Sequence, residues 1–147
     1  MANPNGFPPG TTLRSWAPPS GADVELVEVG PYWDAVRTPA DIGECALRLL
    51  GEATGAVIAD YSLMYWLIPP GHAQYLRRMQ RNVNALGADC AVVTYVGVPP
   101  ATHTTGPRLH WRVPVGPDRY LTDSHRLREA LARAIATEPE TGPEAGR

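Results

Sequence analysis

The chain contains no lysine. All thirteen of its basic residues are arginine, and fifteen acidic residues leave a formal net charge of −2. With so small a net charge, the chain as a whole neither attracts nor excludes nucleic acid. Codon bias in a GC-rich genome explains the exclusive use of arginine more simply than a special need for arginine in phosphate recognition.

Long hydrophobic runs are also missing. No stretch approaches the roughly 18 apolar residues that a membrane helix needs, and residues 1–10 have neither the basic nor the apolar part of a signal peptide. We therefore expect no membrane insertion and no secretion, and we predict a cytoplasmic protein.

Cysteine is scarce, because the chain has only Cys45 and Cys90. Neither stands in a CxxC motif or in a spacing typical of zinc ligands. We predict two buried free thiols in a reducing compartment. No cofactor and no metal site are expected.

The charges are unevenly distributed along the chain. Residues 1–66 hold three arginines and eight acidic residues, residues 67–134 hold nine arginines and four acidic residues, and residues 135–147 are acidic again. Such a distribution would steer an anionic partner to one side of the molecule. In a chain this small, the same asymmetry also arises by chance.

The length of 147 residues and a hydrophobic content of 44% predict one globular domain. Residues 1–23 are rich in proline and glycine and have few apolar side chains, which is typical of a flexible arm. Residues 137–147 are predicted to form a disordered acidic tail. The folded domain would then span residues 24–136.

The apolar pattern predicts eight elements in the order β-α-β-β-α-β-β-α. They are strand 24–29, helix 39–50 with Thr38 as its N-cap, strands 56–59 and 63–68, helix 72–86, strands 90–98 and 109–113, and helix 123–136 with Thr122 as its N-cap. The first six match the split βαβ arrangement of ferredoxin-like folds. We therefore predict an α+β fold with a mostly antiparallel sheet, helices on one face, and the other face free.

An open sheet face is where related folds stack the bases of single-stranded nucleic acid on aromatic side chains. Tyr95, Trp111 and either Tyr65 or Trp66 can supply such rings. The choice depends on the strand register, because a shift of one residue moves each side chain to the opposite face.

Two stretches, Leu63–Gly71 and Leu86–Val113, resemble the N-terminal domain of bifunctional DNA primase/polymerases, the prim-pol domain. In that family a hydrophobic strand ends in a Pro/Gly turn. A glycine-bearing strand, a PP-x-x-H-x-x-G loop and an aromatic-x-Trp strand follow. The matching residues of the second part are Pro99, Pro100, His103, Gly106 and Trp111. The resemblance covers roughly residues 33–127 and is closest to short, divergent members.

The chain departs from this family at the catalytic positions. Active members place a D-x-D or D-x-E pair at a strand end, because Mg²⁺ prefers hard oxygen ligands and bridges the triphosphate. Here Asp60 stands alone, and Glu25 and Glu28 lie on opposite faces of one strand. The family's nucleotide-contacting His is missing around residues 62–64. The resemblance thus implies a degenerate, non-catalytic domain that binds nucleic acid or a nucleotide as an accessory protein.

Arginines supply the predicted binding surface. Arg77, Arg78 and Arg81 would share one side of helix 72–86, and Arg108 and Arg112 would add further phosphate contacts. A solvated helix face has the same pattern. The rings of Tyr95 and Trp111 would stack on bases. The side chain of His103 would contact phosphate, or would only stabilise its own loop.

Two other functions stay open. A protein-interaction or regulatory module without nucleic-acid affinity would use the proline-rich arm and the acidic tail. A true nucleotidyltransferase would collect metal ligands from Asp60, Asp89 or Asp123 in an unfamiliar arrangement. A zinc site formed by Asp123 with histidines has no tight ligand spacing to support it.

Overall fold

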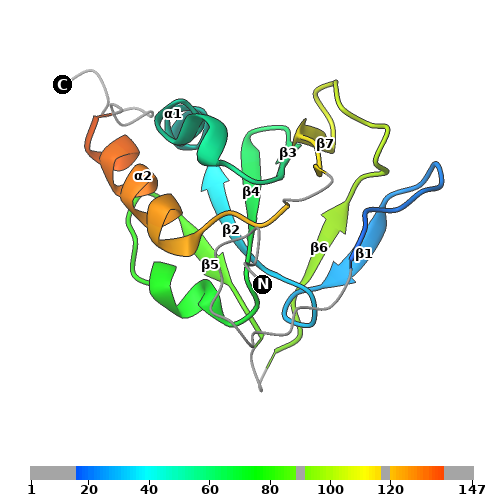
Figure 1. Ribbon diagram of the computed structural model, residues 1–147, viewed down its shortest axis with the longest axis horizontal. Coiled ribbons are helices and arrows are strands. Elements are labelled where there is room, and N and C mark those ends of the chain that lie inside the picture. Colours follow the sequence, from blue (N-terminus) through cyan, green and yellow to red (C-terminus); the bar gives the residue numbers. More distant parts are fainter. Residues whose placement is uncertain (1–15, 89–91, 117–119, 138–147) are drawn as a thin grey trace, which may run out of the picture.

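The structure, a computed structural model, describes residues 16–88, 92–116 and 120–137. It contains two α-helices, two short 3₁₀ helices and seven strands within these ranges (Figure 1). In chain order they are β1 Glu25–Glu28, β2 Asp34–Pro39, α1 Ala40–Leu50, η1 Gly51–Ala53, β3 Val57–Asp60, β4 Leu63–Ile68, η2 His72–Leu76, β5 Asn84–Leu86, β6 Tyr95–Val98, β7 His110–Val113 and α2 Ser124–Thr137.

Five strands form one antiparallel sheet in the order β5-β2-β4-β3-β7. Helix α1 connects β2 to β3, and β4 is inserted between these two strands. The unit β2-α1-β3 is therefore a split βαβ, and β5 completes the ferredoxin-like strand order. The predicted α+β class and the mostly antiparallel sheet are confirmed.

Both α-helices pack on the same face of this sheet, as predicted (Figure 1). The apolar stripe of α1 buries Ile42, Cys45 and Ala46, and α2 buries Leu127 and Leu131. These side chains meet the sheet residues that point toward the helices. The 3.6-residue period of both helices, which is visible in the sequence, thus identifies one half of the core.

The opposite sheet face is covered, so the expectation of a free face is wrong. Side chains of the sheet on this face, such as Ile58 and Leu67, pack against Val96 and Val98 of β6 and against Trp33. The core beneath the helices covers one face of the central strands, and this second apolar cluster covers the other, so water is excluded from both faces. A stacking platform for bases is therefore absent from the sheet surface that the structure describes.

The predicted helix 72–86 does not form. Only η2 is helical, and the left-handed backbone at Arg78 (φ 65°), Arg81 (φ 60°) and Asn82 (φ 63°) prevents its continuation. The chain then enters β5, which pairs with β2. Pairing at the sheet edge satisfies the backbone groups of β2 and outweighs the helical spacing of apolar residues.

Three strand assignments also differ. Strand β2 was not predicted. It includes Thr38, which was expected to be the N-cap of the first helix, whereas Pro39 is the N-cap of α1. The predicted strands 24–29 and 90–98 contain β1 and β6, which within the described part of the chain pair only with each other, in a separate two-stranded sheet. Strand β6 is therefore not a central strand.

Packing begins before the predicted domain start at residue 24. The Trp16 ring lies 5.6 Å from that of Trp33 and 5.4 Å from that of Tyr120, and the Pro19 carbonyl accepts a hydrogen bond from Ala101 N–H. Residues 16–19 thus belong to the folded unit rather than to a flexible arm. The rest of the predicted arm, residues 1–15, and nearly all of the predicted tail lie outside the described residues.

Candidate functional site

The three arginines predicted to share a helix face lie on the segment between η2 and β5. Arg77 and Arg78 are exposed, whereas Arg81 donates a 3.4 Å hydrogen bond to the carbonyl of Ile135 in α2. This contact anchors the segment to the C-terminal part of α2. Arg77 and Arg78 are therefore the better phosphate ligands of the three.

The other predicted contacts lie at the opposite end of the molecule, around β6, β7 and the loop between them (Figure 1). Tyr95, His103 and Arg108 are exposed there. Tyr95 pairs with Glu28 across the β1–β6 sheet, so a carboxylate stands beside its ring. The structure consequently does not join these residues to Arg77 and Arg78 in one site.

Trp111 and Arg112 have structural partners. The ring of Trp111 is 1% exposed, so it cannot stack on a base, and this part of the prediction is wrong. Arg112 in β7 forms a bidentate ion pair with Glu44 in α1, with both N···O distances at 2.9 Å. Hydrogen bonding to Glu44 raises the pKa of Arg112. The guanidinium of Arg112 is therefore already used in linking β7 to α1.

The residues that match the prim-pol loop motif hold one another in place. Trp111 donates from Nε1 to the Pro99 carbonyl at 3.0 Å and from its backbone N–H to the His103 carbonyl at 2.8 Å. His103 in turn donates its N–H to the Pro100 carbonyl at 2.9 Å. A structural role in closing the loop thus accounts for four of the five matching residues.

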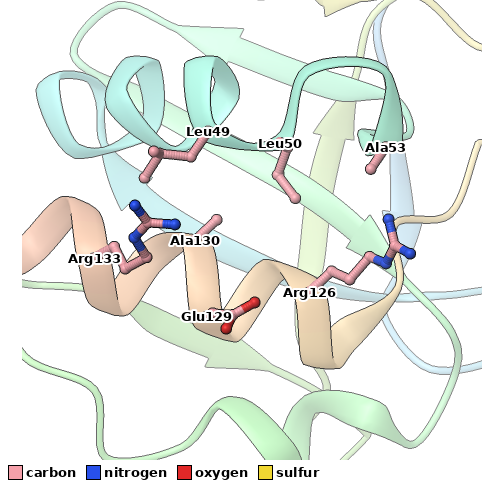
Figure 2. Close-up of a pocket in the computed structure, with 7 residues that line it drawn as sticks. All are labelled: Leu49, Leu50, Ala53, Arg126, Glu129, Ala130 and Arg133. Atoms are coloured by element: carbon pink, nitrogen blue, oxygen red, sulfur yellow. The ribbon is translucent and has the colours of Figure 1, made fainter.

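A groove of about 300 Å³ runs between α1 and α2. Figure 2 shows Arg126 and Arg133 on α2 at its two ends, with Glu129 between them along the helix. Apolar side chains of α1 and η1 face them across the groove. The lining residues are Leu49, Leu50, Ala53, Arg126, Glu129, Ala130 and Arg133. Two guanidinium groups beside an apolar floor suit a ligand with an anionic group and an apolar body.

A second groove, of about 370 Å³, lies on the other flank of α2. Arg128 of α2 and Arg78 of the segment after η2 both line it, beside Met79 and Ile135. Arg128 also donates from Nε to the carbonyl of Tyr75 at 3.0 Å. We call Arg77, Arg78, Arg126, Arg128 and Arg133 the arginine surface.

An exposed pair of rings adjoins the arginine surface. Tyr75, which is 42% exposed, lies 5.1 Å from the ring of His125 at an interplanar angle of 37°. The ring of His72 meets Tyr75 edge-on, also at 5.1 Å. Tyr75 lies within the predicted helix 72–86, and it is exposed because η2 ends at Leu76. These rings can stack on planar ligands.

A polar cluster adjoins these rings and includes the partly buried His72. His72 Nδ1 is 2.9 Å from Ser124 Oγ, and the buried Asp34 accepts a hydrogen bond from Ala73 N–H at 2.9 Å. Burial raises the pKa of Asp34 and lowers that of His72. Ser124 is only 1% exposed. A serine without access to a substrate is no nucleophile, so we assign this cluster a structural role.

Metal chemistry finds no support within residues 16–88, 92–116 and 120–137, where no group of three or more His, Cys, Asp or Glu side chains could hold a metal ion. Asp60 ends β3, Asp123 precedes α2, and Asp89 lies outside the described residues. In the same part of the chain, no helix is long and apolar enough to cross a membrane.

Arg126, Arg128, Arg133 and His125 were not predicted as phosphate or base contacts. A signal was available for them. The predicted helix 123–136 has a clear buried face, and its period places the three arginines on the flanks of that face. What the sequence could not show is that Arg78 and Tyr75 lie beside this helix, because their placement depends on the end of η2.

Comparisons with protein-family models, with curated proteins and with solved structures find no match to this chain. The resemblance to prim-pol domains therefore stays a prediction from the motif residues. The function must be inferred from the site itself.

Proposed function

We propose that the protein binds single-stranded nucleic acid across α2, with phosphates on the arginine surface and bases on the Tyr75–His125 ring pair. The observation that carries this proposal is the direct link between rings and arginines, since Arg128 donates to the carbonyl of Tyr75. Proteins that bind single strands combine a positive surface with aromatic rings in this way.

The charge on both flanks of α2 favours an anionic ligand. All five members of the arginine surface are exposed, and among the described residues only Arg128 of these five forms a hydrogen bond through its guanidinium group. Glu129 lines the same groove as Arg126 and Arg133, and Asp123 accepts a hydrogen bond from Arg126 N–H. Most of the guanidinium groups are therefore available to phosphates.

Ring stacking adds affinity that does not depend on phosphate charge. The ring of Tyr75 contacts two histidine rings and is supported at its backbone by Arg128, so it would lose little freedom on binding. Base stacking of this kind tolerates any sequence. We therefore propose a binding protein with little base preference, acting in the cytoplasm, where a free thiol such as Cys45 stays reduced.

Fluorescence anisotropy of a labelled single-stranded oligonucleotide tests the proposal. Five phosphate contacts predict an affinity loss of about 100-fold between about 50 and 200 mM salt. The double variant Arg126→Ala/Arg133→Ala should bind more weakly and with a shallower salt dependence. Arg112→Ala is the matched control, because this arginine is paired with Glu44 at the edge of α1.

Two results would overturn the proposal. One is the absence of binding at both salt concentrations, which would favour the protein-interaction alternative. The other is an equal loss of affinity in Arg112→Ala and in the double variant, which would place the ligand elsewhere on the molecule.

A further inference from the structure

The two-stranded sheet of β1 and β6, here called the ribbon, concentrates exposed apolar side chains at the end of the molecule away from α2 (Figure 1). Leu26 is 74% exposed, Tyr95 56% and Val24 47%. The inward side chains Val96 and Val98 are buried. The exposed side chains share the outward face, which monomeric proteins rarely leave so apolar.

The outer edge of β1 has no partner strand among the described residues. Val29 donates its backbone N–H to the Thr94 carbonyl at 2.8 Å, so the backbone groups of Val29 point toward the strand that contains β6. In an antiparallel pair, residues whose N–H and C=O groups point toward the partner strand alternate with residues whose groups point away from it. The backbone groups of Leu26 and Glu28 therefore point away from β6 and are free to pair.

We propose that this edge pairs with β1 of a second copy of the chain, antiparallel and about a two-fold axis at Leu26. Directly opposed residues of two antiparallel strands point their side chains to the same face of the sheet. The two-fold axis must therefore pass through a position at which a residue is opposed by its own copy. Centring on Leu26 opposes Leu26 with its own copy and Val24 with Glu28. The free backbone groups of all three then form hydrogen bonds, and the two ribbons join into one four-stranded sheet.

Side-chain charge agrees with this register. Glu28 is opposed by Val24 of the second copy, and Glu25 is opposed by Val27, so no two carboxylates stand directly across from each other. The two Leu26 side chains meet on the outward face. The surface is thus complementary to itself, as an isologous dimer requires. The inference goes beyond nucleic-acid binding, because α2 lies at the other end of the fold.

Sedimentation equilibrium of the full chain without nucleic acid, between about 1 μM and 1 mM, measures this association. Leu26→Pro removes only an N–H that faces away from β6, which edge strands tolerate. It should weaken dimerisation at least tenfold. Leu26→Lys, which opposes two like charges, should do the same if proline disturbs β1. Tyr95→Ser is the matched control on the same face and should keep the dimer.

Disulfide trapping tests the register itself. In a Cys90→Ala background, Leu26→Cys should oxidise to a covalent dimer, since residues opposed in a hydrogen-bonded pair have Cα atoms about 5.5 Å apart, within disulfide reach. Glu25→Cys, displaced from the axis, should cross-link much more slowly.

Three results would overturn the proposal. The first is a monomer throughout the concentration range. The second is a dimer that Tyr95→Ser abolishes and Leu26→Pro retains, because it would pack face to face. The third is equal cross-linking of the two cysteine variants.

Discussion

His72 Nδ1 and Ser124 Oγ lie 2.9 Å apart, and this contact joins η2 to the first turn of α2. The ring pair of the proposed binding site depends on it, because Tyr75 lies on η2 and His125 on α2. Loss of the contact would separate the rings that we propose to stack on bases. The titration of His72 therefore bears on both stability and binding.

We expect the protein to lose stability on mild acidification because of His72. Burial lowers its pKa from the ordinary 6.5, and the charge of His125 acts in the same direction, while Asp34 and Asp123 oppose it. The folded state thus favours the neutral ring, and below about pH 6.5 protons bind preferentially to the unfolded chain. Urea unfolding at about pH 7.5 and pH 5.5 should show a smaller decrease for His72→Asn than for the wild type. Identical pH dependence of the two proteins would contradict this assignment.

Asp34 should show the opposite dependence. Burial raises its pKa above the ordinary 3.8, although hydrogen bonds from Ala73 and Gly71 and the charges of His72 and Arg77 partly counteract this. Its Oδ1 atom is buried and has no hydrogen-bond partner among the described residues. Stability that comes from protonated Asp34 is present at low pH and is lost as the pH rises through the raised pKa.

The variant Asp34→Asn tests this, because it keeps an oxygen for the Ala73 N–H and removes the buried charge. It should raise the free energy of unfolding at pH 7 by more than at pH 4, relative to the wild type. Urea titrations at the two pH values measure the difference, and a gain that is larger at pH 4 would refute the argument.

Much of the fold could be predicted from local patterns. The α1 stripe, the β3–β4 hairpin and the buried face of α2 follow from residue periodicity, which depends only on neighbours in the chain. Strand β2 was missed because its sequence, DAVRTP, has no clear apolar alternation, and its pairing with β4 and β5 is a long-range contact. The segment after η2 was mistaken for helix because the pairing of β5 with β2 is a long-range contact that no local pattern records.

The candidate site could be predicted only in part. The excess of arginine in the second half of the chain pointed to a basic surface, and Arg77 and Arg78 belong to it. The buried state of Trp111 depends on how β6 and Trp33 cover the sheet, and the pairing of Arg112 depends on the position of α1. Both are tertiary relationships, so residue type and alternation alone could not distinguish a binding ring from a core ring.

Trp111 should prove to be a structural residue. Trp111→Phe keeps much of the apolar volume but leaves the Pro99 carbonyl without its donor, so we expect a loss of about 1–3 kcal/mol in unfolding free energy. Oligonucleotide affinity, measured by anisotropy under conditions where the variant is folded, should stay unchanged. Weaker binding by the folded variant would contradict this assignment and would indicate that nucleic acid binds near β7.

Arg112 should matter little to either property. Its ion pair with Glu44 is about half exposed on both sides, and such pairs contribute about 0.2–1 kcal/mol. Thermal unfolding of Arg112→Ala should therefore shift only slightly, and its affinity for single strands should equal that of the wild type. A clear loss of affinity would mean that phosphate competes successfully with Glu44 for the guanidinium.

Tyr75 and the arginine pair should affect binding in different ways. Removing Arg126 and Arg133 eliminates two phosphate contacts, so the slope of log affinity against log salt should become shallower by about 1.4. Tyr75→Leu keeps the apolar bulk and removes the ring, so affinity should fall at every salt concentration while the slope stays constant. Stacking contributes about 1–3 kcal/mol per base, which corresponds to a loss of affinity of at least about fivefold.

Anisotropy over a salt series separates the effect of the arginines from that of the Tyr75 ring, with Tyr95→Leu as a control for a ring at the far end of the molecule. If Tyr75→Leu and Tyr95→Leu lose affinity equally, or if Tyr75→Leu alters only the slope, bases do not stack on Tyr75.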